Sequence, residues 1–288
     1  MNVGSVTIPS TNPQSGRSPA PPQVGLGTRL LLGDRCTDVV LKAIEIGYRY
    51  IDTSPSYGNE DAAGRAIDLS GIDRREMFVT TKVERDELRP ERLLASAQRS
   101  LDTLGLDWID LLLIHWPNAD VPISETLSAM GELQRCGVVS HIGVANFPVA
   151  MLDETIAAAG RAGTRLFANQ IEVHPSLPQR RLVAACTARG VRAIAYSPMG
   201  REDLGHTAVL DVAKRTGRTP AQVVLRWHIQ NGVLPVPIPE TGEPGQIASQ
   251  FDLFEFELSN EDMAALAGVG PERRYFSPPW APAWDPQD

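Results

Sequence analysis

The chain has 288 residues, of which 42% are hydrophobic and 22% are charged, and this composition excludes disorder as its main state. A formal net charge of -8 argues against nucleic acids and anionic membranes as partners, because both require a basic face. We therefore expect a globular monomer whose partners are small molecules, with no nucleic-acid or membrane partner.

Cysteine use and the N-terminal sequence predict a location in the cytoplasm. Cys36, Cys136 and Cys186 are too few and too widely spaced for a disulfide framework. The N-terminus has no basic segment followed by an apolar one, and no apolar run approaches the length of a membrane span. The histidines show no metal-ligand spacing, so no metal is predicted.

The order of elements along the chain predicts one α/β domain, a single (β/α)8 TIM barrel. Residues 1–23 are rich in proline and read as an N-terminal arm, after which apolar β-type runs alternate with helical segments over residues 24–269. Residues 270–288 form a tail rich in proline and aromatic residues, which we expect to fold over one barrel mouth. The strand-like runs are residues 24–27, 48–53, 77–83, 108–115, 140–146, 167–172, 191–197 and 233–238.

Two of the helical segments carry clear local signals. Leu94, Ala97, Leu101 and Leu104 recur at helical spacing and predict one apolar stripe facing the sheet. The run 219–222 (Thr-Pro-Ala-Gln) combines a capping hydroxyl, a first-turn proline and a glutamine, which is the pattern of a capping box.

Polar side chains that follow the apolar runs are the candidates for chemistry, because catalytic groups of such barrels lie at the C-terminal ends of the strands. Asp52 and Tyr57 follow the second run, Lys82 lies near the end of the third, and His115 ends the fourth. A buried lysine is costly unless it is paired, so we expect Lys82 to pair with Asp52, and a purely structural ion pair is the alternative reading. An ammonium beside Tyr57 would lower the pKa of its hydroxyl toward neutrality and make it a general acid for a carbonyl oxygen.

A dinucleotide-binding Rossmann fold is the competing reading of the N-terminal part. Gly25 and Gly27 match the first two glycines of its fingerprint, and Asp52 could imitate its ribose-binding acid. Leu30 replaces the third glycine, and the eightfold alternation also opposes this reading.

Six short motifs resemble the aldo-keto reductase family in their usual order, most closely its short bacterial members of the 2,5-diketo-D-gluconate reductase type. The match covers about residues 24–260. The motifs are residues 51–60 (IDTSPSYGNE), 81–82 (TK), 113–117 (LIHWP), 143–147 (GVANF), 169–175 (NQIEVHP) and 195–200 (AYSPMG).

This resemblance implies an oxidoreductase that moves hydride from NADH or NADPH to a small aldehyde or ketone. The catalytic tetrad falls on Asp52, Tyr57, Lys82 and His115, with Tyr57 as proton donor, Lys82 lowering its pKa, Asp52 holding Lys82 and His115 orienting the carbonyl. Asn146 and Gln170 would hold the nicotinamide carboxamide, Tyr196 would stack under the ring, and residues 197–203 would cover the pyrophosphate. The implied cofactor contacts are Thr28, Asn146, Gln170, Tyr196, Ser197, Met199, Gly200, Glu240, Thr241, Gln246 and Gln250.

The implied substrate pocket departs from the family pattern. Arg29 and Glu84 stand where tryptophan is common, while Trp116 is retained and Phe147 is expected to add apolar contact. Ala145 replaces a common serine, which predicts weaker cofactor binding. We therefore expect a pocket of mixed polarity.

A further departure concerns cofactor choice. Members that favour NADPH commonly carry a lysine and an arginine after the eighth strand, and here Glu240 and Gln246 take these positions. Thr241 keeps a hydroxyl, so some use of NADPH is compatible with the sequence. An acidic side chain repels a 2′-phosphate but accepts hydrogen bonds from a free 2′-hydroxyl, so we expect NADH to serve as well as NADPH or better.

Two other functions remain compatible with the barrel. One is an aldolase in which Lys82 forms a Schiff base with the substrate, since a desolvated lysine suits that chemistry. The other is a non-catalytic regulatory barrel that binds the cofactor as a sensor, a reading that the complete tetrad disfavours.

Overall fold

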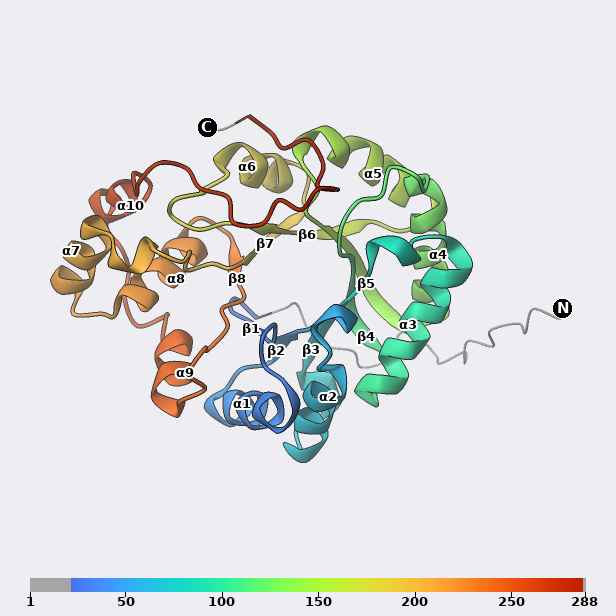
Figure 1. Ribbon diagram of the computed structural model, residues 1–288, viewed down its shortest axis with the longest axis horizontal. Coiled ribbons are helices and arrows are strands. Elements are labelled where there is room, and N and C mark those ends of the chain that lie inside the picture. The colour runs from blue at the N-terminus through green and yellow to red at the C-terminus, as the bar shows by residue number, and fades with distance from the viewer. Residues whose placement is uncertain (1–21, 287–288) are drawn as a thin grey trace, which may run out of the picture.

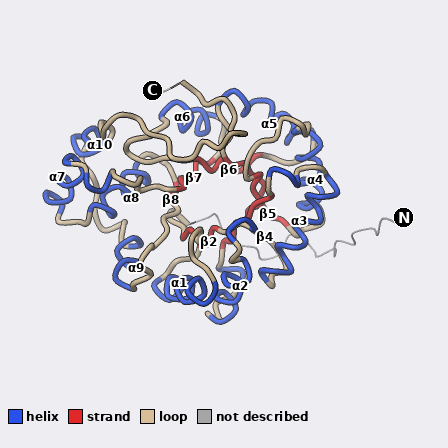
Figure 2. The backbone as a smooth tube through the Cα atoms, viewed as in Figure 1, coloured by secondary structure: helices blue, strands red, loops and turns tan. Residues whose placement is uncertain are grey.

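A computed structural model describes residues 22–286, so the expected N-terminal arm lies almost wholly outside the described residues. Eight parallel strands form one sheet in chain order, and the sheet curls round with the helices on its outside (Figure 1; Figure 2). All eight strands fall within or beside the predicted runs. Their bounds are β1 Leu26–Gly27, β2 Tyr50–Asp52, β3 Phe78–Val83, β4 Ile109–Ile114, β5 Val139–Ala145, β6 Leu166–Glu172, β7 Arg192–Tyr196 and β8 Leu234–Pro235.

The two ends of the sheet meet at the β1 and β8 segments. The Gly25 amide donates to the Pro235 carbonyl at 3.0 Å, and the Gly27 amide donates to the Pro237 carbonyl at 2.9 Å. A Cβ atom on Gly25 would lie 2.7 Å from Tyr50 Cδ1, and one on Gly27 would lie 3.0 Å from the Val236 carbonyl oxygen. Glycine is therefore needed at both positions because the backbones approach too closely for a side chain.

In residues 22–286, ten α-helices connect or follow the strands. Their bounds are α1 Gly33–Ile46, α2 Glu60–Leu69, α3 Pro90–Leu104, α4 Ile123–Arg135, α5 Val149–Arg161, α6 Arg180–Ala188, α7 Thr207–Thr216, α8 Pro220–Gln230, α9 Pro244–Phe251 and α10 Asn260–Leu266. Helix α3 buries Ala97, Leu101 and Leu104 of its predicted stripe, and Leu94 packs against the core. Helix α8 begins with the predicted capping box at Thr219.

The alternation of side chains along each strand divides the core into an inner and an outer layer. In β4, Leu111 and Leu113 pack in one cluster with Tyr50, whereas Leu112 and Ile114 pack in another cluster with helix residues. This is the period-two geometry of a strand whose faces are both buried. Side chains that follow the inner layer beyond the strand ends therefore converge on one space. No helix in residues 22–286 is both long enough and apolar enough to cross a membrane.

Candidate active site

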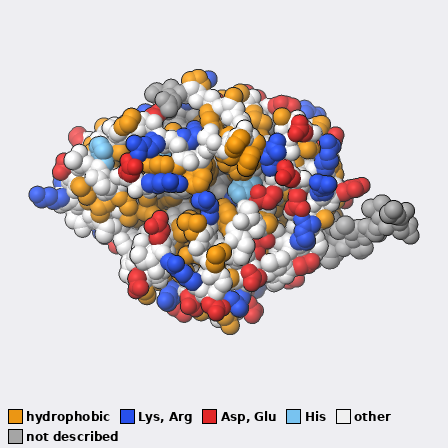
Figure 3. Space-filling view, viewed as in Figure 1, with side chains coloured by type: hydrophobic (Ala, Val, Ile, Leu, Met, Phe, Trp, Pro, Cys, Tyr) orange, Lys and Arg blue, Asp and Glu red, His pale blue; other side chains and the backbone are white. Residues whose placement is uncertain are grey.

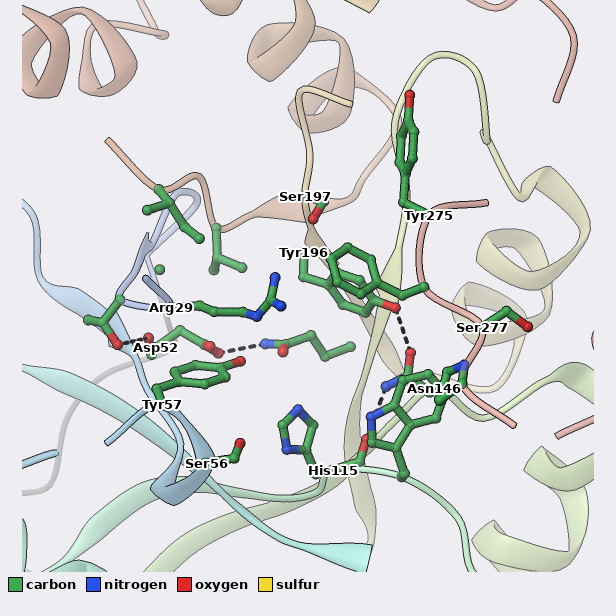
Figure 4. Close-up of a pocket in the computed structure, with 18 residues that line it drawn as sticks. Arg29, Asp52, Ser56, Tyr57, His115, Asn146, Tyr196, Ser197, Tyr275 and Ser277 are labelled. Atoms are coloured by element: carbon green, nitrogen blue, oxygen red, sulfur yellow. Dashed lines mark hydrogen bonds between the residues drawn. The ribbon is translucent and has the colours of Figure 1, made fainter. Parts of the chain in front are cut away.

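A cavity of about 580 Å³ lies at the carboxyl ends of the strands. In the space-filling view this face is hollowed at its centre, with a histidine and Lys or Arg side chains near the hollow (Figure 3). The cavity draws its walls from several strand ends and from the C-terminal tail (Figure 4). The predicted residues that line it are Thr28, Arg29, Asp52, Tyr57, His115, Trp116, Asn146, Gln170, Tyr196 and Ser197.

A buried ion pair forms the base of the site. Lys82 Nζ lies 2.6 Å from Asp52 Oδ1 and donates a second hydrogen bond to the Thr53 carbonyl at 2.9 Å. The Lys82 side chain has no exposed surface. Burial disfavours its charge, but the Asp52 carboxylate and the Tyr57 hydroxyl together outweigh this effect and hold the pKa of Lys82 above its ordinary value. The predicted pair is therefore present, and Lys82 is a buried ammonium.

Tyr57 lies directly above this pair, in the short 3-10 helix Pro55–Tyr57. Lys82 Nζ is 5.0 Å from the centre of the Tyr57 ring. Burial raises the pKa of the Tyr57 hydroxyl, and although Lys82 and Arg29 both act to lower it, the net shift is upward. The expected shift toward neutrality is thus wrong for the free protein, because desolvation of the phenolate exceeds the attraction of the two cations.

His115 faces Tyr57 across the cavity, with the two rings edge to face and their centroids 6.1 Å apart. Its Nδ1 atom lies 2.8 Å from Glu84 Oε1. Glu84 was expected in the wall of the substrate pocket, but among the described residues it lies behind His115 and not in the cavity lining. The hydrogen bond to His115 draws the Glu84 carboxylate back from the cavity, and this corrects the expectation.

The strand-end amides form a connected set. Gln170 Nε2 donates to Asp52 Oδ2 at 2.5 Å, Tyr196 donates to Asn146 Oδ1 at 2.8 Å, and Asn146 Nδ2 donates to the His115 carbonyl at 3.0 Å. Asn146 and Ser197 adopt left-handed backbone conformations, with φ of 65° and 47°. Such conformations are strained for residues other than glycine and are common where side chains are aimed into a functional site.

A second cavity of about 530 Å³ lies beside α9 and continues from the loop after β7. The predicted cofactor residues Met199, Gly200, Glu240, Gln246 and Gln250 all line it. Thr241 is not in its described lining and instead donates to Gln246 Oε1 at 2.8 Å. Gln250 Oε1 is buried and has no hydrogen-bond partner among residues 22–286, so a polar group of a ligand would satisfy it. Ser197 lines the first cavity and Met199 the second, so the loop after β7 borders both.

Besides Glu84, the sequence interpretation misplaced one further residue, and it missed several. Phe147 was expected in the substrate pocket, but it is fully buried in the outer core and outside the described lining of the cavity. Asn59, which carried no prediction of its own, donates to the carbonyls of Thr28 and Leu31 at 2.8 Å and 2.6 Å and so fixes the loop after β1. The sequence signal for Asn59 was its position in the same motif as Tyr57. Cavity residues without a specific prediction include Ser56, Val236, Ile238, Tyr275, Ser277 and Pro278.

The C-terminal tail is fixed at the cavity by Glu172, at the end of β6. Its Oε1 accepts from the Tyr275 amide at 2.7 Å, and its Oε2 accepts from the Phe276 amide at 3.0 Å. His174 Nε2 lies 3.1 Å from the same carboxylate, and its Nδ1 lies 3.2 Å from Asp203 Oδ2. This buried network joins the tail to the loop after β7, so both segments are held in place together.

Comparison with known proteins identifies the family to which the chain belongs. A model of the aldo/keto reductase family matches residues 33–206 and 205–270. The chain belongs to the aldo/keto reductase family. It is 39% identical over 264 residues to an aldo-keto reductase of Mycobacterium sp. (strain KMS), covering 89% of this chain and 94% of that protein. It is 38% identical over 265 residues to 2,5-diketo-D-gluconic acid reductase B of Corynebacterium sp. (strain SHS752001), covering 91% and 93%.

The solved structure of one similar protein contains a bound cofactor. The structure of an aldo-keto reductase of Bombyx mori in complex with NADP is 32% identical, with a TM-score of 0.81 over 89% of this chain and 91% of that one. This chain is accordingly an NAD(P)H-dependent oxidoreductase that reduces carbonyl compounds. The aldolase and sensor alternatives find no support, and the buried, charged Lys82 is neither accessible nor nucleophilic.

The tail network of this reductase leads to a first prediction. Glu172→Gln keeps the side-chain shape but removes the charge that strengthens the hydrogen bonds from Tyr275 and Phe276. We expect amide hydrogen exchange at these two residues to become faster by about tenfold or more, since about 1.4 kcal/mol corresponds to that factor. The control is Glu202→Gln, because the exposed Glu202–Arg273 pair contributes little. Equal exchange in both variants would show that Glu172 does not hold the tail.

Proposed function

We propose that Asp52, Tyr57, Lys82 and His115 carry out carbonyl reduction, with Tyr57 as the proton donor. The observation that carries this proposal is the convergence of a hydroxyl, a carboxylate and an imidazole on one cavity (Figure 4), with a buried lysine paired to that carboxylate. We infer in addition that the curled sheet is a closed (β/α)8 barrel over residues 24–269, because two backbone hydrogen bonds join its β1 and β8 segments. The tail then covers the substrate pocket.

Each side chain has a separate task in this proposal. Bound nicotinamide would supply the hydride to the carbonyl carbon. The Tyr57 hydroxyl transfers its proton to the carbonyl oxygen as negative charge develops there, so that an alcohol and a tyrosinate result. The Lys82 ammonium favours that tyrosinate electrostatically, and Asp52 keeps the ammonium in place. His115 orients the carbonyl oxygen.

The raised pKa of Tyr57 is compatible with this role. Its hydroxyl stays protonated at neutral pH, which is the form that a proton donor needs. The cations matter after the transfer, because Lys82 and Arg29 both lower the pKa of Tyr57 and so favour the anion that the reaction creates.

Removal of the Tyr57 hydroxyl tests the central role. Tyr57→Phe keeps the ring above Lys82, so cofactor binding should be nearly unchanged while reduction slows by about 10² to 10⁴, the usual effect of losing a general acid. Steady-state kinetics and a fluorescence titration with NADH measure the two quantities. Near wild-type turnover on a reactive aldehyde would show that another group donates the proton.

We infer that NADH is used as well as NADPH or better. Glu240 and Gln246 line the second cavity, where an adenosine ribose would lie, and Glu240 is exposed. Gln246 Oε1 is engaged by Thr241, which leaves its amide nitrogen for a hydroxyl acceptor. Arg201 also lines this cavity, but its guanidinium lies over the Tyr275 ring at 4.9 Å, on the side of the tail.

A double variant tests this cofactor choice. Glu240→Lys with Gln246→Arg places two cations where a 2′-phosphate would lie, and we expect kcat/KM to shift toward NADPH by at least about tenfold, or roughly 1.4 kcal/mol. Steady-state kinetics with both cofactors, on wild type and variant, supply the measurement. A wild type that strongly prefers NADPH would overturn the proposal.

We propose that the substrate carries an anionic group in addition to its carbonyl. Arg29 lines the cavity and points into it above Tyr57 (Figure 4), and its guanidinium lies over the Phe276 ring at 4.9 Å. Arg29 is exposed and forms no ion pair with the described residues, although the chain as a whole is acidic. A free guanidinium in a mixed pocket fits a carboxylate. The similar Corynebacterium protein is named for a carboxylic acid substrate.

A matched pair of aldehydes tests this substrate class. With 4-carboxybenzaldehyde and its methyl ester, we expect wild-type kcat/KM to favour the acid by about tenfold, because a charge-assisted hydrogen bond contributes about 1.5–3 kcal/mol. Arg29→Gln should abolish the difference, and Arg29→Lys should retain part of it. If Arg29 instead acts on the cofactor, both aldehydes will slow equally and the KM for NADH will rise.

A further inference from the structure

The strand register places Glu84 beside His115. Strands β3 and β4 are parallel with Lys82 opposite Leu113 and Val83 opposite Ile114, so the next pair in the same register is Glu84 and His115. The His115 amide continues the pairing with a hydrogen bond to the Val83 carbonyl at 2.9 Å. Side chains opposite one another on adjacent strands share a face, and this explains the contact between carboxylate and imidazole.

The Glu84 carboxylate is held as an anion. Burial alone would raise the pKa of Glu84, but the hydrogen bond and the charge of His115, together with hydrogen bonds from Ser56 and Ser54, lower it to about 2. Ser54 Oγ donates to Glu84 Oε1 at 2.9 Å, in addition to the contact from His115 Nδ1 at 2.8 Å. Glu84 is therefore ionised throughout the neutral range and acts purely as an acceptor.

The Glu84 carboxylate, as the hydrogen-bond acceptor at Nδ1, determines which nitrogen of His115 can donate a hydrogen bond to the substrate. The Nδ1 atom must carry a proton to form the hydrogen bond with Glu84, so in the neutral ring Nε2 carries a lone pair. The other nitrogen points into the cavity (Figure 4). It can donate to a carbonyl oxygen when the ring is doubly protonated, and it cannot donate when the ring is neutral.

We propose that Glu84 is a positioning residue that fixes the proton of His115 on Nδ1, so that His115 binds the substrate carbonyl as an imidazolium. This inference rests on the proposed role of His115. It makes reduction depend on a second proton, and kcat/KM should therefore fall as pH rises and the ring becomes neutral. Histidine is the side chain whose protonation ordinarily changes near neutral pH.

Other ionisable groups at this cavity do not produce the same dependence. Tyr57, from the 3-10 helix after β2, and Tyr196, from β7, both have a pKa raised by burial. Lys82, from β3, has a pKa raised by Asp52. Arg29, from the β1 loop, is a permanent cation. These groups thus keep their charge states around neutral pH.

A direct test measures the tautomer of His115 in the free protein. Long-range ¹H–¹⁵N spectra distinguish the protonated nitrogen from the unprotonated one, and His115→Asn assigns the signals by their loss. In wild type, the neutral ring should carry its proton on Nδ1. In Glu84→Gln the amide can donate to Nδ1, so a population with the proton on Nε2 should emerge. A wild-type ring that carries its proton on Nε2 would overturn the proposal.

The kinetic test compares pH profiles of reduction. Wild-type kcat/KM should fall about tenfold per pH unit once the ring is neutral, whereas Glu84→Gln should vary by less than about threefold from about pH 6 to about pH 9, since its neutral ring can donate from Nε2. The control is Asp86→Asn, which removes an exposed carboxylate two residues away that pairs with Arg85. It should keep the wild-type profile.

The outcomes separate this inference from the proposed function. Superimposable profiles for wild type and Glu84→Gln, with normal rates in both, would reject the positioning role of Glu84. A His115→Asn variant that reduces carbonyls at the wild-type rate would instead reject His115 as a participant, and the tautomer spectra would still report on its pairing with Glu84.

Discussion

The structure of the site depends on the buried pair between Lys82 and Asp52. Removing two charges from water costs several kcal/mol per ion, and the cost is offset when every charged atom has a partner. Asp52 meets this condition with Lys82 on one oxygen and Gln170 on the other. The Thr53 carbonyl accepts a further hydrogen bond from Lys82. The pair thereby joins β2, β3 and β6 inside the curled sheet and holds a positive charge beneath Tyr57.

Most of the fold could be predicted because its strands are buried on both faces. Such strands appear in the sequence as continuous apolar runs, and the polar residues at their ends mark the rim where a parallel sheet collects them. Asp52, Lys82 and His115 come from neighbouring strands, so their convergence follows from strand order alone. Asn146 and Gln170 reach the same cavity for the same reason, since Asn146 follows β5 and Gln170 lies near the end of the adjacent β6.

The features that the sequence did not predict depend on the relative size of opposing effects or on contacts between residues that are far apart in the chain. Phe147 follows Asn146, whose left-handed backbone turns the chain and directs the next side chain into the core. The pKa of Tyr57 reflects competition between burial and two cations, and a sequence gives the sign of each effect without its size. The tail reaches Glu172 from more than one hundred residues away, through backbone amides that carry no side-chain signal.

Two carboxylates near Tyr57 each pair with a basic side chain. Asp52 holds the Lys82 ammonium below the ring, and Glu84 holds the His115 imidazole across the cavity. Glu84 lies behind His115, outside the described lining of the cavity, whereas the Asp52 carboxylate lines the cavity and Lys82 is fully buried beside it. In the proposed mechanism, a protonated His115 presents positive charge to the developing oxyanion, while the Lys82 ammonium acts on Tyr57. Electrostatic stabilisation of this kind is strongest where water is excluded, and the tail residues that Glu172 holds, Tyr275 and Phe276, form part of the cavity wall.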